Sequence, residues 1–369
     1  MAAADKVEVR SLLLNELQEE LHKLGEPSYR ADQIAHWLFK RPVKSFEEMT
    51  DLSRDLRAQL ANQFAFSKMD VVRVLGSHDT TRKFLFRLSD GNLIESVLIP
   101  ASPALYGGSS DRRTICLSTQ VGCAYGCKFC ASGLDGFSRN LRPNEIIDQI
   151  IAIEDESGEK IDNIVFMGMG EPLANFGNLM RAIRIINASW GLGIGARHIT
   201  VSTSGLAPQI KKLADEPLQI RLAISLHAAT DEVRNQIMPI NRKYNIETLL
   251  SACDYYAGRK KQRLTFEYIL IAGVNDADVQ ANLLARHARR LSAKVNLIPY
   301  NIVEDLDWSR PSRNRQEKFL SILRAHKIPA TLRREKGHDI DAACGQLRSR
   351  AARESSRPGS PPESARMDP

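Results

Sequence analysis

The sequence predicts an α/β fold in which strands and helices alternate, as they do in an open or closed (β/α) barrel. From residue 113 onward, short apolar runs typical of strands recur along the chain, and helical patterns separate most of them. This alternation favours parallel strands joined by right-handed crossovers. The predicted strands span residues 113–118, 163–167, 198–202, 220–225, 264–271, 295–298 and 330–333.

A helical pattern comes before the barrel. Residues 1–65 are predicted to form a small accessory domain, because apolar residues recur at helical spacing over 12–24 and 30–39. Ser45 and Glu48 have the spacing of a capping box, which predicts the start of a third helix. Its apolar face is predicted to carry Leu52, Leu56 and Leu60. Such a module suits either packing against the core or binding RNA.

The next segment, residues 66–105, is predicted to be a short β-rich linker. Its residues alternate between apolar and polar over 70–75, 81–88 and 93–99. Glu95 lies in the last of these runs between apolar neighbours. The alternation alone predicts that the Glu95 side chain faces solvent.

The remaining chain divides into a core and a tail. Residues 106–347 contain the strand–helix alternation and are predicted to form the barrel core. Residues 348–369 are rich in arginine, serine and proline and have no apolar periodicity. This composition predicts a disordered tail.

The composition excludes several classes of protein. With 43% hydrophobic and 26% charged residues, the 369-residue chain matches ordinary globular proteins. It has neither an apolar run as long as a membrane span nor an apolar secretory signal, so we expect a cytoplasmic protein without membrane association. In that reducing compartment, six cysteines indicate metal or redox chemistry. A net charge of +7 permits a polyanionic partner such as nucleic acid.

Three of the cysteines lie within eight residues. Cys123, Cys127 and Cys130 have the spacing Cys-x3-Cys-x2-Cys, which suits an iron–sulfur cluster or another soft-metal site. Three ligands leave one iron of a [4Fe–4S] cluster free to bind a small molecule. A structural zinc site with a distant fourth ligand, or chance clustering, is the alternative, although zinc sites usually consist of two separated pairs.

Polar residues follow the predicted strands where each one ends. Because the carboxyl ends of parallel barrel strands meet at one face, these residues are predicted to form a single ring-shaped site. The candidates are Gly170 and Glu171 after the second strand, Ser202 at the end of the third, Ser225, Leu226 and His227 at the fourth, and Asn301 after the sixth.

The cysteine loop together with Gly-Glu-Pro at 170–172, Ser-Leu-His at 225–227 and Pro-Tyr-Asn at 299–301 resembles the radical S-adenosylmethionine (SAM) enzymes. That resemblance implies a partial (β/α) barrel of the radical SAM type. It also implies a cluster whose open iron binds the amino and carboxylate groups of SAM. In such a site Glu171 would accept a hydrogen bond from the methionyl ammonium, and hydroxyl and amide groups would bind the rest of the cofactor.

Two further cysteines narrow the class. Cys116 lies just before the cluster loop, and Cys344 lies in the distant segment Asp-Ile-Asp-Ala-Ala-Cys-Gly-Gln-Leu at 339–347. From the residues alone each could be an ordinary buried cysteine. The segment 339–347, together with 118–123 and 136–141, is similar to the RlmN/Cfr-type radical SAM RNA adenine methyltransferases. The similarity extends over nearly the whole chain except the tail.

This resemblance implies a two-stage reaction that uses two SAM molecules per turnover. Cys344 would first be methylated by one SAM. The 5′-deoxyadenosyl radical from a second SAM would then remove a hydrogen from that methyl group, and the carbon radical would add to an adenine ring carbon. Glu95 would accept the proton, and Cys116 would release the product by forming a disulfide with Cys344. The radical is needed because an electrophilic methyl donor does not methylate the electrophilic amidine carbon of adenine.

The same resemblance implies the partners. The substrate would be an adenine of 23S rRNA and of tRNA, extruded from RNA structure, and a flavodoxin or ferredoxin would donate electrons to a monomeric enzyme. Two alternatives stay open. One is methylation at carbon 8 of adenine instead of carbon 2. The other is a non-catalytic iron–sulfur protein that binds RNA, for which Cys344 would have no role.

Overall fold

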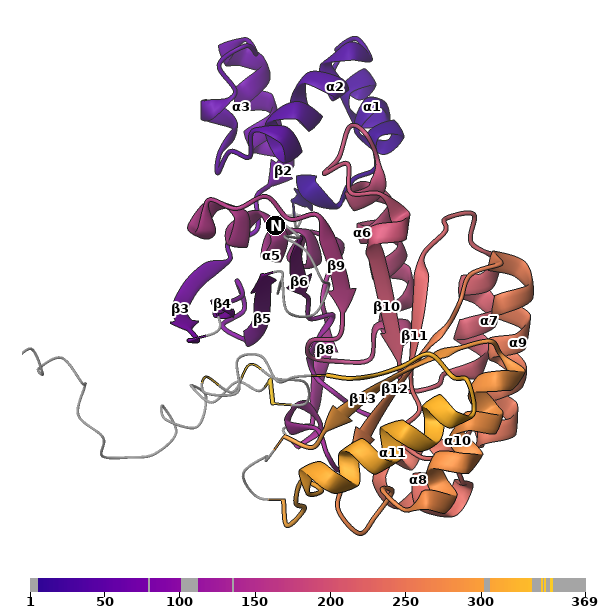
Figure 1. Ribbon diagram of the computed structural model, residues 1–369. Coiled ribbons are helices and arrows are strands. Elements are labelled where there is room, and N and C mark those ends of the chain that lie inside the picture. The colour runs from indigo at the N-terminus through magenta and orange to yellow at the C-terminus, as the bar shows by residue number, and fades with distance from the viewer. Residues whose placement is uncertain are drawn as a thin grey trace, which may run out of the picture.

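The computed structural model describes residues 6–78, 80–100, 112–134, 136–301 and 306–333, together with 340, 342, 346 and 347. Cys344, the last part of the linker and the predicted tail at 348–369 therefore lie outside the described residues. Figure 1 shows a helical part at the N-terminal end and a larger part built on a curved sheet.

Ten strands form that sheet in the described part of the chain. They are β3 (Asp70–Gly76), β4 (Arg82–Arg87), β5 (Leu93–Pro100), β6 (Arg113–Cys116), β9 (Asn163–Phe166), β10 (Ile199–Thr203), β11 (Arg221–Ser225), β12 (Thr265–Leu270), β13 (Lys294–Pro299) and β14 (Ala330–Leu332). Their order is β14-β13-β12-β11-β10-β9-β6-β5-β4-β3. Strands β6 and β9 to β14 pair in parallel, which confirms the predicted α/β fold. Because β14 and β3 are the two edges, the barrel is open.

The three linker strands are part of this same sheet. Strand β5 pairs antiparallel with β6, and β4 and β3 follow as further antiparallel strands. The predicted linker is therefore a wing of the barrel sheet, and its register fixes where its side chains lie relative to the barrel.

Each parallel strand has one apolar and one polar face. The side chains of Phe166, Val201, Ile224 and Phe266 are fully buried and share one face of the sheet by register. Figure 1 shows helices covering the outer face of the curved sheet. The alternate residues, such as Ser202, are small or polar and face the interior of the open barrel. The covering helices are α5 (Pro143–Ser157), α6 (Phe176–Asn187), α7 (Ala207–Asp215), α8 (Asp231–Ile237), α9 (Ile246–Lys260), α10 (Asp278–Arg290) and α11 (Arg313–Ala325).

Shorter elements connect these parts. Strands β7 (Gln120–Gly122) and β8 (Phe137–Asn140) form an antiparallel ribbon, and β1 (Val7–Glu8) pairs in parallel with β2 (Phe64–Ala65). Single 3-10 turns occupy Val9–Ser11, Phe46–Glu48, Ala131–Gly133, Pro172–Asn175, Ala196–His198 and Pro239–Arg242. Among the described residues, the longest helices fall short of the length and apolarity needed to cross a membrane.

The N-terminal part contains α1 (Leu14–Lys23), α2 (Tyr29–Ala35) continued by a π-helical turn at His36–Lys40, and α3 (Arg54–Gln63). The prediction that Ser45 and Glu48 open the third helix is wrong. Ser45 precedes only a 3-10 turn, and the chain leaves helical geometry at Met49, with ψ 72°. Burial of the Met49 and Leu52 side chains overrides the local capping signal. Ser53 caps α3 instead, accepting a hydrogen bond from Leu56 N at 3.2 Å.

A buried ion pair joins the N-terminal part to the core. Arg10 Nη1 lies 2.9 Å from Asp148 Oδ1 of α5, and Arg10 Nη2 donates to the carbonyl of Val43 at 2.6 Å. Ser67 Oγ donates to the other oxygen of Asp148 at 2.8 Å. The guanidinium thus bridges the helical part and a core helix, which fixes how the two parts meet.

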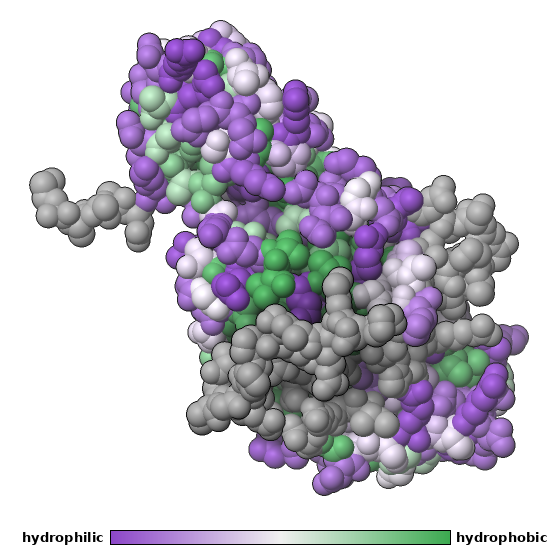
Figure 2. Space-filling model, turned by 90° about the vertical axis from the view of Figure 1, so that its left-hand side faces the viewer, coloured by the Kyte–Doolittle hydropathy of each residue, from purple (hydrophilic) through white to green (hydrophobic). Residues whose placement is uncertain are grey.

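Strand β3 forms an exposed edge of the sheet. Its Val71, Val72 and Val74 side chains are all more than a third exposed. Figure 2 views the molecule from this side and shows mostly hydrophilic N-terminal helices above a face with some apolar surface. Arg73 places a charge in the same strand, a feature that discourages edge-to-edge pairing.

Candidate active site

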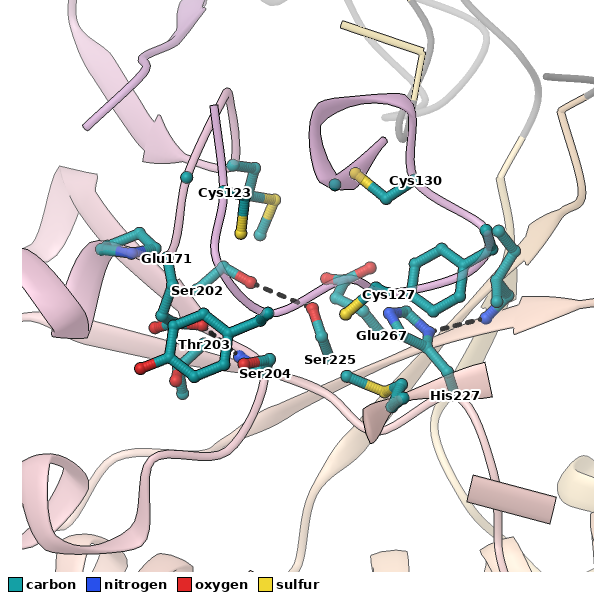
Figure 3. A pocket seen from close by; sticks show the side chains of 18 of the residues that line it. Cys123, Cys127, Cys130, Glu171, Ser202, Thr203, Ser204, Ser225, His227 and Glu267 are labelled. Atoms are coloured by element: carbon teal, nitrogen blue, oxygen red, sulfur yellow. Dashed lines mark hydrogen bonds between the residues drawn. The ribbon is translucent and has the colours of Figure 1, made fainter. Parts of the chain in front are cut away.

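A cavity opens where the parallel strands end. Counted together with its open mouth, it has a volume of about 930 Å³. Its walls come from the cysteine loop and from the ends of β9, β10, β11, β12 and β13 (Figure 3). Of the predicted site residues, those that line it are Cys123, Cys127, Cys130, Gly170, Glu171, Ser202, Ser225 and His227. The structure therefore brings the predicted cluster ligands and five of the seven predicted cofactor contacts to one site.

The ribbon β7–β8 positions the cysteine loop. Cys123 N donates to the carbonyl of Gly136 at 2.8 Å, and Lys128 N donates to the carbonyl of Ile237 at 2.9 Å. Gly122 has φ 70°, and an added Cβ there would lie 1.9 Å from the Gly136 oxygen. The residue before the first cysteine must therefore be glycine.

The three thiols surround one shared space at the cavity (Figure 3). Burial, with a smaller contribution from Cys130, raises the pKa of Cys123 to about 12, and burial raises the pKa of Cys127 well above its usual value. Thiols this hard to ionise need a cationic partner to become thiolates, and iron supplies one. In the described ranges no three His, Cys, Asp or Glu side chains converge as ligands of a single ion. Each cysteine of a [4Fe–4S] cube binds a different iron, so a cluster does not require the three thiols to converge on one ion.

Glu171 organises the loop after β9. Its Oε2 accepts a hydrogen bond from Ser204 N at 2.7 Å, and its Oε1 accepts one from Leu173 N at 3.1 Å. Burial raises the pKa of Glu171, against the effect of these hydrogen bonds. The preceding Gly170 has φ 97°, and a Cβ there would come within 2.5 Å of the Gln120 side chain. The Gly-Glu pair thus keeps a carboxylate at the cavity wall on a tightly packed turn.

A row of polar side chains crosses the interior face of the sheet. Ser202 Oγ of β10 lies 3.4 Å from Ser225 Oγ of β11. Ser225 is the register partner of Glu267 on β12, and all three side chains line the cavity. Glu267 is only 5% exposed, and it is not among the site residues predicted from the sequence. The sequence feature that could have identified Glu267 is a single acidic residue within a mostly apolar strand.

His227 supports the cysteine loop. Its ring packs edge-on against Phe129 of the loop, with centroids 4.6 Å apart. Its Nδ1 accepts a hydrogen bond from Ile269 N at 3.0 Å. Burial, with the nearby Arg234 charge, lowers the pKa of His227 to about 3. The imidazole is therefore neutral and carries its proton on Nε2.

The other two predicted cofactor contacts lie beside the cavity. Leu226 is fully buried, and its carbonyl accepts a hydrogen bond from Arg234 Nε at 3.0 Å. Asn301 is 2% exposed, and its Oδ1 accepts a bond from Arg310 Nη2 at 3.3 Å. Neither side chain belongs to the cavity wall formed by the described residues.

Arg234, which was not predicted from the sequence, donates hydrogen bonds to backbone carbonyls that follow two of the strands. Its guanidinium is fully buried and also donates to the carbonyl of Ser204 at 2.5 Å and to Asn241 Oδ1 at 3.0 Å. Burial lowers the pKa of Arg234 to about 10, so it stays cationic at neutral pH. Nothing in the local sequence distinguishes this arginine from a surface helix residue, because its partners come from three other segments.

Glu95 and Cys116 lie on the same sheet face as the cavity. Val97 pairs with Cys116, and Cys116 pairs with Val165; register partners share a face, and Glu95 shares the face of Val97. Glu95 is only 4% exposed, so the prediction from alternation alone that it faces solvent is wrong. Its carboxylate lies 3.2 Å from the ammonium of Lys83, which is also buried.

Of the other three cysteines, Cys116 and Cys253 are buried, and Cys344 lies outside the described residues. Cys116 is 8% exposed at the end of β6. Cys253 is fully buried in α9, as expected for a structural cysteine. Cys344 lies outside the described residues, so its role stays a prediction.

Known proteins are similar to this chain in sequence and in architecture. The family model for the radical SAM superfamily matches residues 117–284, and the model for the ribosomal RNA large subunit methyltransferase N-terminal domain matches residues 7–65. A protein of Akkermansia muciniphila called probable dual-specificity RNA methyltransferase RlmN is 53% identical over 332 residues, which cover 90% of this chain and 92% of that protein.

Two further comparisons agree. A relative with the same name in Bacillus thuringiensis subsp. konkukian is 47% identical over 355 residues, which cover 95% of this chain and 96% of that protein. The crystal structure of a radical SAM methyltransferase from Sphaerobacter thermophilus superposes with a TM-score of 0.86 at 46% identity. That alignment covers 93% of this chain and 99% of the other.

Proposed function

The chain belongs to the RlmN family of radical SAM RNA methyltransferases, and on that premise we propose that it methylates carbon 2 of an adenine in 23S rRNA and in tRNA. One observation carries the proposal. The sheet register places Glu95 and Cys116 on the same interior face as the cavity that the three cluster cysteines line. A base and a thiol are thus held on the side where a radical would form.

The enzyme uses a [4Fe–4S] cluster and SAM, and together they supply a 5′-deoxyadenosyl radical. In the proposed arrangement Cys123, Cys127 and Cys130 hold the cluster. Gly170, Glu171, Ser202, Ser225 and His227 form the wall against which SAM binds. Leu226 and Asn301 are proposed as further SAM contacts, through backbone groups or after rearrangement of the side chain.

The thiol of Cys344 loses its proton and takes a methyl group from one SAM. That methyl group would lose a hydrogen atom to the 5′-deoxyadenosyl radical, and the remaining carbon would form a bond to carbon 2 of the adenine. The adduct would lose the proton on carbon 2 to Glu95 and its unpaired electron to the oxidised cluster. The Cys116 thiolate would then attack the sulfur of Cys344 and break the bond between that sulfur and the CH2 carbon. This carbon would take up a proton and become the new methyl group, and the two cysteines would be left as a disulfide. An electron donor such as flavodoxin or ferredoxin, or a cellular thiol, reduces the enzyme for the next turnover.

The Lys83–Glu95 ion pair supports the role of Glu95. A carboxylate acts as a base only when it is ionised, and burial without a cation favours the protonated acid. The Lys83 ammonium, 3.2 Å away, favours the ionised form. Ser118 Oγ donates to the Glu95 carbonyl at 2.5 Å, which fixes the backbone at this position.

RNA is the substrate, and the proposed working form is a cytoplasmic monomer without membrane association. The N-terminal helical domain at 1–65 is proposed to contact RNA. The barrel core at 106–347, with the wing formed by the linker, is proposed to carry the chemistry.

Mass spectrometry and nucleoside analysis together test the proposed function. The purified chain, loaded with its cluster and exposed to SAM, is expected to carry a methyl group on Cys344, and a Cys344→Ala variant is expected to lack it. Ribosomal RNA from a strain that lacks the enzyme is expected to lose 2-methyladenosine. Loss of 8-methyladenosine instead would contradict the choice of carbon 2, and an unmodified Cys344 would contradict the mechanism.

A further inference from the structure

Glu267 carries a buried carboxylate that the protein leaves half satisfied. Its Oε1 accepts a hydrogen bond from Asn296 Nδ2 at 2.9 Å. Its Oε2 is buried and has no hydrogen-bond partner among the described residues. An unsatisfied buried acceptor destabilises a protein, and more so when it is charged. Because Glu267 is one of the residues that line the cavity, a ligand bound there can supply the missing donor to its carboxylate.

The position of Glu267 selects the part of SAM that it can reach. It is the register partner of Ser225, whose hydroxyl lies 3.4 Å from that of Ser202. Figure 3 shows the Glu267 carboxylate near its register partner Ser225 among the residues that line the cavity. Three acceptor groups therefore lie side by side on strands spaced about 4.8 Å apart.

The chemistry of the row favours one donor. SAM offers an ammonium, an adenine amino group and two ribose hydroxyls. The family resemblance places the ammonium at the open iron. A carboxylate oxygen is a pure acceptor, whereas a serine hydroxyl can donate or accept. The two ribose hydroxyls of SAM can each donate and accept a hydrogen bond. They are well matched by one group that only accepts, such as the Glu267 carboxylate, next to hydroxyls that can also donate, such as those of Ser225 and Ser202.

We propose that Glu267 is a SAM-binding residue whose Oε2 accepts a hydrogen bond from a ribose hydroxyl. The inference rests on the proposed function, in which SAM occupies this cavity. Burial raises the pKa of Glu267, while the charges of Arg333 and Lys294 and the bond from Asn296 oppose that shift. A hydroxyl donor would stabilise the ionised form further, so SAM and the Glu267 charge support each other.

The test measures binding affinity, independently of turnover. Equilibrium dialysis under anaerobic conditions would compare the cluster-loaded full chain with SAM, 2′-deoxy-SAM and 3′-deoxy-SAM. The wild type is expected to bind one of the deoxy analogues about 10-fold or more weakly than SAM, the effect of losing a hydrogen bond to a charged group. Glu267→Gln is expected to bind SAM about as weakly as the wild type binds that analogue.

The decisive result is whether removing the ribose hydroxyl and substituting Glu267 affect SAM affinity independently or together. In Glu267→Gln, SAM and the discriminated deoxy analogue are expected to bind equally well. If the cluster content of Glu267→Gln is reduced, Glu267→Asp, which keeps the charge and shortens its reach, provides the same comparison. Glu247→Gln, an exposed glutamate on α9, is the matched control and is expected to keep full discrimination.

Two results would overturn the proposal in distinguishable ways. If the wild type binds SAM and methylates RNA but binds both deoxy analogues as tightly as SAM, Glu267 has no ribose partner and the proposed function survives. The same holds if discrimination persists in both Glu267 variants. If the cluster-loaded wild type does not bind SAM at all, the proposed function and this inference both fail.

Discussion

Two regions of the same sheet face carry polar side chains, and protein groups satisfy these side chains more fully in one region than in the other. On the parallel strands β10 to β12, Ser202 and Ser225 make only a long contact with each other, and Glu267 keeps one oxygen without a partner in the described structure. On the antiparallel strands β4 and β5, Lys83 and Glu95 form an ion pair. We infer that a bound ligand completes the hydrogen bonds of the first region, whereas protein groups alone balance the charges of the second.

The energetic consequences differ as well. A half-satisfied acceptor destabilises the protein until a ligand completes it, and the completed bond then contributes to affinity. A buried ion pair contributes little net stability, because desolvation of the two charges offsets their attraction, but removing one partner leaves an uncompensated buried charge and is costly. Substitutions in the first region should therefore change binding more than stability, and substitutions in the second should change both.

The largest expected effect is loss of the cluster from the open region. Cys127→Ala is expected to abolish iron binding and RNA methylation, because the cluster supplies the chemistry. Iron and sulfide content per chain and the visible absorption of the cluster measure the change. Cys253→Ala, which removes a buried cysteine of α9, is the control and should keep its iron. Normal iron content in Cys127→Ala would show that another residue is the ligand.

The next effect concerns the paired region. Lys83→Met removes one member of a buried ion pair and is expected to lower the free energy of unfolding by about 3–5 kcal/mol. The double variant with Glu95→Gln should recover part of that loss, because no charge then needs a partner. Urea unfolding of the four proteins measures both effects. Lys44→Met is the control, because Lys44 pairs with Asp155 at the exposed surface and should contribute less than about 1 kcal/mol. Simple additivity of the two buried substitutions would contradict the pairing.

Gly170→Ala sharpens the comparison by changing the wall of the open region without changing its charge. The added Cβ would clash with Gln120 in a left-handed backbone conformation, so we expect a destabilisation of about 1–3 kcal/mol. SAM affinity should fall together with stability. Gly177→Ala on α6 meets no atom within 4 Å and should change the unfolding free energy by less than about 1 kcal/mol. An equal effect of both substitutions would contradict the packing argument.

The smallest effect lies on the far side of the sheet, near α5. Burial and the carboxylate of Asp148, with a smaller contribution from Glu145, raise the pKa of Glu8 from 4.5 to about 7. Between these two values the unfolded chain ionises first, so Glu8 reduces stability as the pH rises through this window. The melting temperature of Glu8→Gln relative to wild type should therefore be higher at about pH 8 than at about pH 4. Glu19→Gln, exposed on α1, is the control. A constant difference across this range would contradict the shift.

The sequence predicted most of what is local. The Cys-x3-Cys-x2-Cys spacing and the polar strand ends were readable because each depends on a few neighbouring residues. Glu267, Arg234 and Lys83 were missed because their roles depend on partners from other strands and loops. Glu267 needs the register between β11 and β12, and Lys83 needs that between β4 and β5. The failed capping box at Ser45 has the same origin, since burial of Met49 outweighed a local signal.

The uninterrupted sheet has a consequence for the geometry of the reaction. Continuing the β5–β6–β9–β10 register by two residues places Glu95 level with Ser202. Three inter-strand steps separate them, about 14 Å at the usual strand spacing. The separation along the sheet between the proposed base Glu95 and the proposed SAM contact Ser202 is thus set by the number of intervening strands. A relative that needed a different interval would have to insert or lose a whole strand.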